Sequence, residues 1–315
     1  MLVVQHTEHF RVEFPCLLTI GTFDGVHLGH QKILNRLKEL KQQLGLKTVV
    51  FTFEPHPRKV LYPEQSDLKL LTDVNEKLEL LEKYGVDLTV VYPFNKSFSE
   101  LDSESYVRDV LKKYLNVKYL VIGYDHRFGQ KRSGDINTLK LFSNELNFEV
   151  EEISPLDVDD IAVSSSKIRR AIESGLVEHA IDLLGHAYFI KAQVVKGKQL
   201  GRTIGYPTAN LKLDSLEKLI PKKGVYFVKI EVRNQSYFGM MNVGTNPTTD
   251  FDNEIKLEVH IFDFNQEIYN QTIRVSFLNR IRDEEKFDSL TELKNAISQD
   301  ERKCRDLILN TLVTL

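Results

Sequence analysis

The sequence of 315 residues predicts two domains of different fold class. Residues 1–185 are expected to form a doubly wound α/β domain around a parallel sheet. Residues 186–315 are expected to form a small antiparallel β-barrel with a C-terminal helix. Three observations predict this division. Strand-like and helix-like runs alternate in the first half, strand-like runs alone follow in the second, and an amphipathic run ends the chain. A linker is expected near residues 184–188.

In the first half, strands are expected at residues 17–20, 48–53, 88–91 and 120–123. The helices between them are expected at residues 33–44, 73–81 and 105–115. Gly45 ends the first of these helices, and Asp73 with Glu76 forms a capping box at the start of the second. The alternation is typical of a parallel sheet that helices cover on both faces.

In the second half, turns with Gly, Asn and Pro separate the apolar runs. Strands are expected at residues 189–195, 225–232, 237–243, 256–262 and 271–277. A helix at residues 290–312 is expected to dock on them. Many short strands without helices between them indicate an antiparallel barrel or sandwich, and we expect the barrel.

The composition is ordinary for a globular protein, with 42% hydrophobic and 28% charged residues and a formal net charge of −3. This charge argues against bulk attraction to nucleic acid or to an anionic membrane surface. The two cysteines, Cys16 and Cys304, lie far apart in the chain, and we find no signal-peptide pattern and no membrane-spanning run. We expect a cytoplasmic protein, a monomer or weak homo-oligomer, with no nucleic-acid or membrane partner.

Residues 21–30, GTFDGVHLGH, follow the first of these strands and open the first helix. Ligands of parallel sheets bind at this place, and glycines let the backbone approach them. A helix start offers free N–H groups to phosphate, and His27 and His30 can each donate a hydrogen bond to a phosphoryl oxygen. The chain lacks the G-x-x-x-x-G-K-[ST] pattern, which excludes a Walker-type site. A tight turn with two surface histidines remains the alternative.

A second phosphate-binding segment is expected at residues 164–169, SSSKIR, after the last strand of the first domain. Hydroxyl groups at a helix start can cap the helix or hold phosphate oxygens, and Arg169 can clamp a phosphate from within it. The alternative is an ordinary serine cap with a solvated arginine.

The barrel domain carries its own polar segment, KGKQLGRTIGYPTAN, at residues 196–210. Its two lysines and Arg202 would attract a triphosphate, and its glycines would allow a flexible flap. Thr208 and Asn210 carry hard oxygen atoms that suit Mg²⁺. The alternative is a polar hairpin loop with a proline turn.

Glu258 lies in a predicted strand, where it shares one face with His260. If that face meets Thr208 and Asn210, the carboxylate can take a proton from a substrate hydroxyl. A solvated surface carboxylate is the alternative.

Four segments of the first half stand out together: GTFDGVHLGH, FEPHP at 53–57, GYDHRFGQKRSGD at 123–135 and VSSSKIRR at 163–170. They resemble the adenylyltransferase half of bacterial bifunctional riboflavin kinase/FAD synthetases. The resemblance implies an H-x-G-H nucleotidyltransferase domain that adenylylates FMN. The ATP contacts it implies are Gly21, Phe23, Asp24, His27, His30, Ser164 and Arg169. The flavin contacts it implies are His56, Asp125, Arg127 and Phe128. Asp125 stands where some members have Asn.

Five segments of the second half resemble the riboflavin kinase half of the same family, in the same order. They are GYPTAN at 205–210, GVYFV at 224–228, MNVGTNPT at 241–248, LEVHIFDF at 257–264 and FLNRIRDEEKF at 277–287. The resemblance implies that Thr208 and Asn210 bind Mg²⁺–ATP and that Glu258 is the general base. The other expected ATP contacts are Lys196, Gly201 and Arg202, and the expected flavin contacts are Arg280 and Arg282. Thr249 stands where an aromatic residue often follows.

The sequence therefore predicts a bifunctional enzyme with riboflavin, FMN, FAD and ATP as small-molecule partners and Mg²⁺ as cofactor. Riboflavin would be phosphorylated to FMN, and FMN would then be adenylylated to FAD and pyrophosphate. The alternative is another H-x-G-H adenylyltransferase with a nucleic-acid-binding barrel, in which Tyr226, Phe227, Tyr237 and Phe238 would stack bases. A class I aminoacyl-tRNA synthetase is disfavoured because no anticodon-binding module is evident.

Overall fold

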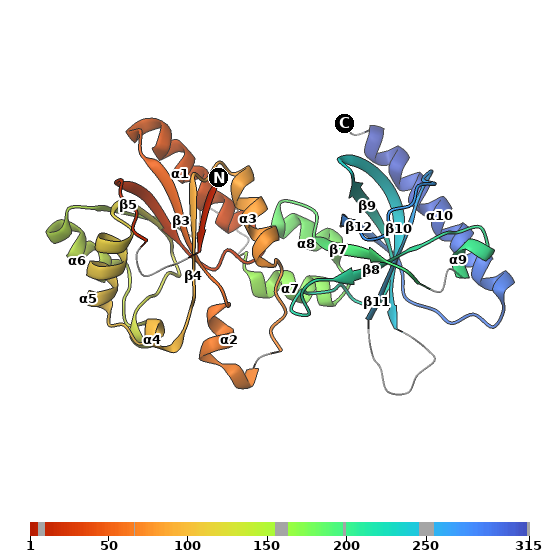
Figure 1. The fold of residues 1–315 in the computed structure, drawn as a ribbon, viewed down its shortest axis with the longest axis horizontal. Coiled ribbons are helices and arrows are strands. Elements are labelled where there is room, and N and C mark those ends of the chain that lie inside the picture. The colour runs from red at the N-terminus through yellow and green to blue at the C-terminus, as the bar shows by residue number, and fades with distance from the viewer. Residues whose placement is uncertain (6–9, 66, 155–162, 198–199, 246–254, 314–315) are drawn as a thin grey trace. The chain divides into compact units, whose positions relative to one another are not determined.

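The computed structural model describes residues 1–5, 10–65, 67–154, 163–197, 200–245 and 255–313. The chain forms two compact units, Met1–Ser165 and Ser166–Leu315, which Figure 1 shows as ribbons. The domain boundary predicted at residue 185 remains a prediction.

The first unit is built on a six-stranded parallel sheet in the order β1-β4-β3-β2-β5-β6. Its strands are β1 (Leu2–Gln5), β2 (Cys16–Ile20), β3 (Lys47–Phe53), β4 (Leu88–Tyr92), β5 (Val117–Gly123) and β6 (Glu149–Ile153). Its α-helices are α1 (Leu28–Leu44), α2 (Pro57–Leu61), α3 (Val74–Lys83), α4 (Lys96–Ser99), α5 (Ser103–Ser105) and α6 (Ile136–Leu146). Short 3₁₀ turns are η1 (Pro63–Gln65) and η3 (Gln130–Arg132).

Both faces of this sheet are covered, as the doubly wound prediction requires. All five residues of β2 are buried. Cys16, Leu18 and Ile20 belong to a core cluster with Val107 and Leu111, while α1 packs on β2, β3 and β5. A strand buried on both faces is largely apolar, which explains why Thr19 is the one polar side chain of β2.

The helix expected at residues 105–115 is present as the π-helix η2 (Tyr106–Tyr114). Its wider turn is visible at the end, where the N–H of Leu115 donates to the carbonyl of Val110 at 2.9 Å. An apolar stripe of this length fits either winding, so the sequence pattern did not distinguish them.

The second unit is a closed six-stranded antiparallel barrel in the order β10-β11-β8-β7-β12-β9, as predicted. Its strands are β7 (Phe189–Val195), β8 (Ala209–Leu213), β9 (Gly224–Val232), β10 (Gln235–Thr245), β11 (Ile255–Ile261) and β12 (Thr272–Arg282). Its helices are α7 (Ser165–Glu173), which begins at the last residue of the first unit, α8 (Val177–Leu184), α9 (Leu200–Thr203) and α10 (Leu290–Val313).

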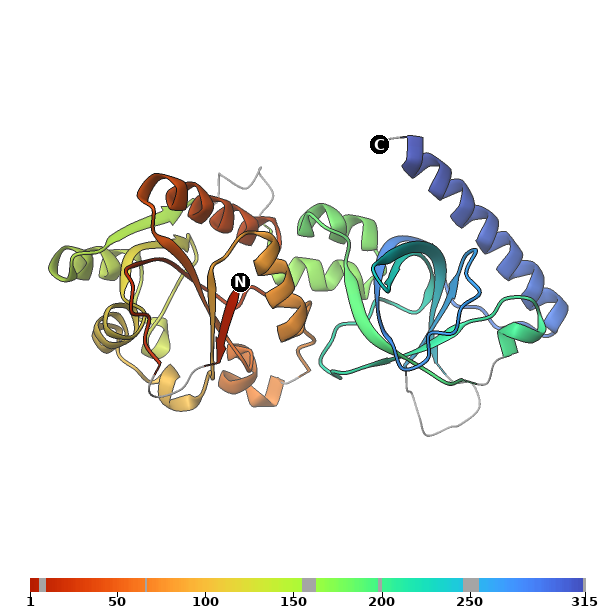
Figure 2. The same ribbon diagram turned by 45° about the horizontal axis from the view of Figure 1, so that its top comes forward.

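The barrel is covered on its outside by two helices. Figure 2 shows α10 along the barrel, where it packs on β10 and β12. The helix α8 also packs on β12, where the carboxylate of Glu178 accepts the backbone N–H of Arg280 at 3.0 Å. Among the described residues, no helix is long and apolar enough to cross a membrane.

Candidate active sites

The topology of the parallel sheet singles out one place for a ligand. The strands β3 and β4 lie on one side of β2, and β5 and β6 lie on the other. In open parallel sheets, ligands bind beyond the carboxyl ends of the strands where the order reverses, which here is between β2 and β5. The segments that leave these two ends begin at Gly21 and Tyr124, so both belong to stretches that the sequence predicts to bind substrate.

The loop after β2 has an irregular backbone. Phe23, Gly25 and Val26 have φ angles of 49°, 82° and 41°. Positive φ is costly for residues other than glycine, and such conformations persist where surrounding contacts fix them. The first contact is made by Gly21, whose N–H donates to the carbonyl of Phe51 at 3.1 Å.

Asp24 supplies the contacts that fix the middle of this loop. Its carboxylate accepts the N–H of Thr72 at 3.0 Å, and the hydroxyl of Thr72 accepts the N–H of Gly25 at 3.0 Å. The backbone carbonyl of Asp24 accepts the hydroxyl of Ser165 at 3.0 Å. Asp24 is 3% exposed, so its carboxylate holds the loop in shape, and a direct contact with ATP remains a prediction.

The two histidines of the loop stack on one another. The ring centroids of His27 and His30 are 3.7 Å apart, and their planes differ by 15°. Burial, His27 and Lys77 hold the pKa of His30 well below its ordinary value of 6.5. Its Nδ1 is buried without a hydrogen-bond partner among the described residues. A neutral imidazole retains one N–H, which it can donate to a phosphoryl oxygen.

The helix α1 begins directly after His27, whose side chain makes no capping hydrogen bond. The first N–H groups of the helix are therefore not used by a side chain of the N-cap residue. Such groups, together with the positive end of the helix dipole, stabilise a bound phosphate.

The predicted flavin contacts of the first unit lie in two different environments. His56 caps α2 by accepting the N–H of Arg58 at 3.1 Å, while Asp125 and Arg127 are exposed. Phe128 is 5% exposed and stacks on Tyr106 with centroids 4.9 Å apart, so most of its surface belongs to the core.

His126 lies between Asp125 and Arg127 in the chain, and it was not predicted as a site residue. Burial, together with Arg132 and Arg127, lowers its pKa to about 4, and its Nε2 has no hydrogen-bond partner among the described residues. Its ring stacks on Phe128 with centroids 5.9 Å apart. The sequence offered no signal for this burial beyond the neighbouring Phe128.

The residues of the predicted second phosphate segment lie at the start of α7. Ser164 directly precedes this helix, and Arg169 lies on it with 7% exposure. The expected helix start at this serine run is thus confirmed, and the phosphate contacts remain predictions.

In the barrel, pairing of strands brings the predicted catalytic residues together. Glu258 of β11 pairs with Asn210 of β8, and the hydroxyl of Thr208 donates to the Glu258 carboxylate at 3.5 Å. Leu257, Val259 and Ile261 on the other face of β11 are buried, as the alternation predicted. Three oxygen-bearing side chains therefore meet at one place, and hard oxygen atoms suit a Mg²⁺ ion that is held largely by nucleotide phosphates.

The backbone around this cluster is closely packed. A Cβ at Gly197 would lie 2.1 Å from the amide nitrogen of Asn210, so a larger residue there would displace that side chain. The Nδ1 atom of His260 lies 2.7 Å from the carbonyl of Pro207, next to Thr208. Asn210 lies in a strand and not in the loop that we expected, and the short helix α9 contains Gly201 and Arg202.

Of Lys196, Lys198 and Thr249, the structure describes only Lys196. Lys196 is exposed, with its ammonium 6.0 Å from the ring centroid of Tyr269. Lys198 and Thr249 lie outside the described residues.

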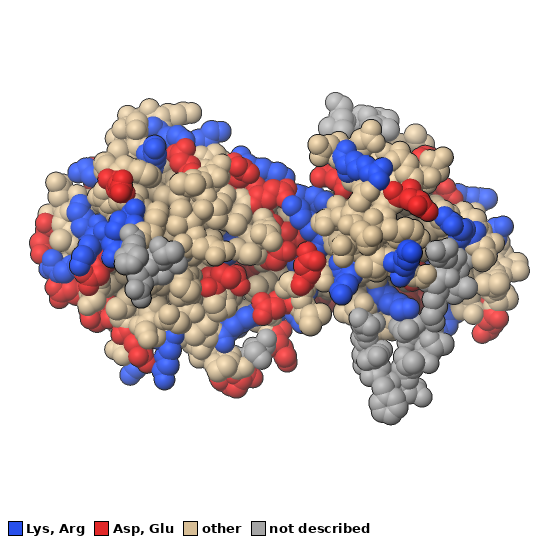
Figure 3. Space-filling view, in the orientation of Figure 1, with Lys and Arg blue, Asp and Glu red and all other residues tan. Residues whose placement is uncertain are grey.

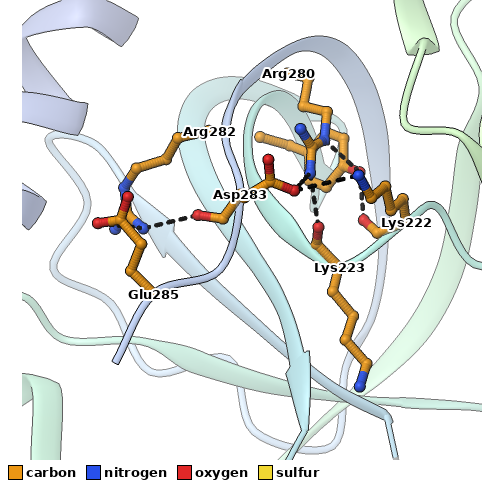
Figure 4. A network of polar contacts seen from close by, with 7 residues as sticks. Lys222, Lys223, Arg280, Arg282, Asp283 and Glu285 are labelled. Atoms are coloured by element: carbon orange, nitrogen blue, oxygen red, sulfur yellow. Dashed lines mark hydrogen bonds and ion pairs between the residues drawn. The ribbon is translucent and has the colours of Figure 1, made fainter. Parts of the chain in front are cut away.

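The two arginines expected to contact flavin are held by partners within the second unit, as Figure 4 shows. The guanidinium of Arg280 donates to the carbonyl of Lys223 at 2.8 Å and to Asp283 at 2.7 Å. The Arg280 and Lys222 side chains lower the pKa of Asp283. The guanidinium of Arg282 pairs with Asp300 of α10 at 2.8 Å. Both arginines thus have structural partners, and their flavin contacts remain predictions.

The aromatic residues that a nucleic-acid-binding barrel would use are in part unavailable. Tyr226 and Phe227 are 0% and 1% exposed, so they belong to the core and cannot stack on bases. Among the described residues on the face shown in Figure 3, basic and acidic side chains are interspersed and form no continuous basic groove.

Comparisons with known proteins match both units. A family model described as FAD synthetase matches residues 10–167, and one described as riboflavin kinase matches residues 184–308. A bifunctional riboflavin kinase/FMN adenylyltransferase from Haemophilus influenzae is 40% identical over 291 residues, 92% of this chain and 93% of the relative. A protein of the same description from Listeria monocytogenes is 38% identical over 289 residues, 92% of this chain and 91% of the relative.

A solved structure matches nearly the whole chain. It is described as a macrolide-efflux protein from Streptococcus pneumoniae, and it superposes with a TM-score of 0.89 at 34% identity. The match covers 97% of this chain and 99% of that chain.

Proposed function

Because this chain belongs to the family of bifunctional riboflavin kinase/FMN adenylyltransferases, we propose that it catalyses two successive ATP-dependent reactions. The second unit phosphorylates riboflavin to FMN, and the first unit adenylylates FMN to FAD. One observation carries the proposal. Each unit matches one family model, and each has its own cluster of polar residues at a place suited to a nucleotide.

In the kinase step, Glu258 accepts the proton of the ribityl 5′-hydroxyl while that oxygen attacks the γ-phosphorus of ATP. The bond between the γ-phosphorus and the bridging oxygen breaks, and ADP leaves. Thr208 and Asn210 would hold Mg²⁺ through their side-chain oxygens, and the ion would neutralise phosphate charge when bound with ATP. The contact between Thr208 and Glu258 supports this assignment, because the hydroxyl of Thr208 lies 3.5 Å from the carboxylate of the proposed base.

In the adenylylation step, an oxygen of the FMN phosphate attacks the α-phosphorus of the second ATP. The bond from the α-phosphorus to the bridging oxygen breaks, and pyrophosphate leaves. The attacking oxygen is already ionised at neutral pH, so positioning and charge stabilisation supply most of the rate. His27, His30, the start of α1, Ser164 and Arg169 would stabilise the phosphates. The remaining predicted contacts are ATP contacts at Gly21, Phe23, Asp24, Lys196, Gly201 and Arg202, and flavin contacts at His56, Asp125, Arg127, Phe128, Arg280 and Arg282.

A time course tests the proposal. The pure protein is supplied with riboflavin, ATP and Mg²⁺, and the flavins are separated by chromatography. FMN should appear first and FAD should follow, and both should cease to form when Mg²⁺ is removed by a chelator. If neither FMN nor FAD formed, the proposal would be wrong. A cytoplasmic location, a monomeric or weakly oligomeric state and the absence of a nucleic-acid partner remain predictions of the sequence.

A further inference from the structure

Lys77 is a buried lysine that the mechanism above does not use. It lies on α3 and is 5% exposed. Its ammonium donates to the carbonyl of Thr22 at 3.3 Å, to the hydroxyl of Thr52 at 3.2 Å and to the carbonyl of Phe53 at 3.3 Å. Three acceptors match the three hydrogens of an ammonium, whereas a neutral amine has only two. The geometry therefore favours a charged side chain.

One acceptor, Thr22, belongs to the loop that leaves β2, and the other two, Thr52 and Phe53, are the last residues of β3. Thr22 lies in the predicted ATP loop, residues 21–30, and Phe53 begins the FEPHP segment that contains His56. Thr52 links the end of β3 to the ATP loop a second time, because its hydroxyl donates to the carbonyl of Thr22 at 3.2 Å. Lys77 thus links the loop after β2 to the end of β3, from which the segment with His56 continues.

The charge of Lys77 also reaches the histidine pair. Lys77 and His27 both act to lower the pKa of His30, in addition to burial. The acidic groups that face Lys77 are Glu54, Asp24 and Asp73, and they oppose the effect of burial on its own pKa. A buried ammonium is costly, and a well-packed apolar residue at this place would cost the fold less.

We propose that Lys77 is a positioning residue for adenylyl transfer, which fixes the ATP loop relative to the segment that carries His56. This inference rests on the proposed function of the first unit. Adenylyl transfer requires the attacking phosphate and the α-phosphorus to be held in line, and a displacement of about 1 Å can cost a factor of about 100 in rate. The positive charge also helps His30 to remain neutral, because it lowers the pKa of that imidazole.

The test replaces Lys77 by methionine, an unbranched apolar side chain one atom shorter, which removes the charge and the hydrogen-bond donors. We expect kcat for FMN adenylylation, per folded molecule, to fall about 100-fold. The pH at which activity falls on the acid side should move upward, because a neighbouring positive charge has been removed. Phosphorylation of riboflavin by the same molecules should be unchanged and serves as an internal control.

Lys83→Met is the matched control, because Lys83 lies on the same helix with its side chain 56% exposed. It should leave both activities unchanged. A merely structural role of Lys77 would lower the melting temperature and the folded fraction without changing kcat per folded molecule or its pH profile. That result in Lys77→Met, with an active parent enzyme, would overturn the inference. An inactive parent enzyme would instead overturn the proposed function.

Thr52→Val decides the question if Lys77→Met does not fold. It removes one acceptor of Lys77 and the second link to Thr22, and it preserves the volume of the side chain. We expect a smaller fall in kcat for adenylylation, about 10-fold, with the kinase activity unchanged. An unchanged kcat for adenylylation in Thr52→Val would contradict the proposed role of the linkage.

Discussion

The rings of His27 and His30 stack with centroids 3.7 Å apart, a distance at which two positive charges would repel each other strongly. The first protonation of the pair therefore disfavours the second. Because burial also lowers the pKa of His30, its ring stays neutral near pH 7 and keeps one N–H to donate.

We predict that FMN adenylylation keeps its activity as the pH falls through 6.5, the ordinary pKa of histidine. A group whose pKa is lowered stays neutral until the pH is well below that value, so the acid limb should lie below 6.5. The measurement is kcat/KM for adenylylation against pH at fixed free Mg²⁺. The kinase activity of the same sample controls for acid unfolding. An acid limb at or above 6.5 would contradict the assignment.

His126 should make the stability of the first unit depend on pH. Its pKa is about 4 in the folded protein, and we take the ordinary histidine value of 6.5 for the unfolded chain. The unfolded chain therefore binds the proton first as the pH falls. The contribution of neutral His126 to the free energy of unfolding is complete above pH 6.5. It is lost as the pH falls toward 4, by up to about 1.4 kcal/mol per pH unit. Urea unfolding at several pH values measures the slope.

His126→Phe should flatten this slope, because phenylalanine keeps an aromatic ring beside Phe128 and cannot be protonated. The control is His179→Phe, since His179 is exposed on α8 in the other unit. Equal slopes in His126→Phe and in the unchanged protein would show that His126 is not the titrating group.

Much of the fold could be predicted because burial leaves clear patterns in this chain. The alternation of strand-like and helix-like runs predicted a parallel sheet covered on both faces, and all five residues of β2 are buried. Asp73 with Glu76 predicted the capping box, which is present with hydrogen bonds of 2.8 and 3.0 Å. The strand β1 was missed because it is only four residues long and largely exposed at the edge of the sheet.

In the candidate sites, features that depend on residues close together in the sequence could be predicted, and contacts between residues far apart in the sequence could not. The spacing of His27 and His30 was visible in the sequence. The structure shows that Glu258 pairs with Asn210, the residue that the sequence analysis expected near its face of the strand. Lys77 could not be predicted, because a lysine next to Glu76 in an amphipathic helix is ordinarily solvated. Its acceptors lie 24 to 55 residues away in the chain, so only the folded structure reveals the contact.

Glu258→Gln should abolish riboflavin phosphorylation and leave FMN adenylylation intact. The amide keeps the shape of the side chain and its contact with Thr208 but cannot accept the hydroxyl proton, so kcat should fall by about 10²–10⁴. Chromatography of reactions started from riboflavin and, separately, from FMN measures the two activities.

Glu231→Gln serves as the control for that variant, because Glu231 is exposed on strand β9 of the same barrel. It should keep both activities. A Glu258→Gln enzyme that still formed FMN at the normal rate would exclude Glu258 as the base.

Asp300→Ala should destabilise the second unit and show whether the structural partner of Arg282 matters for flavin binding. The Asp300 side chain is 4% exposed and pairs with Arg282, so its removal leaves a largely buried guanidinium without its main partner. We expect a loss of about 2–3 kcal/mol in the free energy of unfolding, measured with urea. Asp306→Ala, an exposed position on the same helix, should change the free energy of unfolding by less than about 0.5 kcal/mol.

If Arg282 also contacts flavin, KM for riboflavin should rise in Asp300→Ala and not in Asp306→Ala, because the arginine is no longer held in place. Equal stability of the two variants would mean that the ion pair does not anchor α10 to β12.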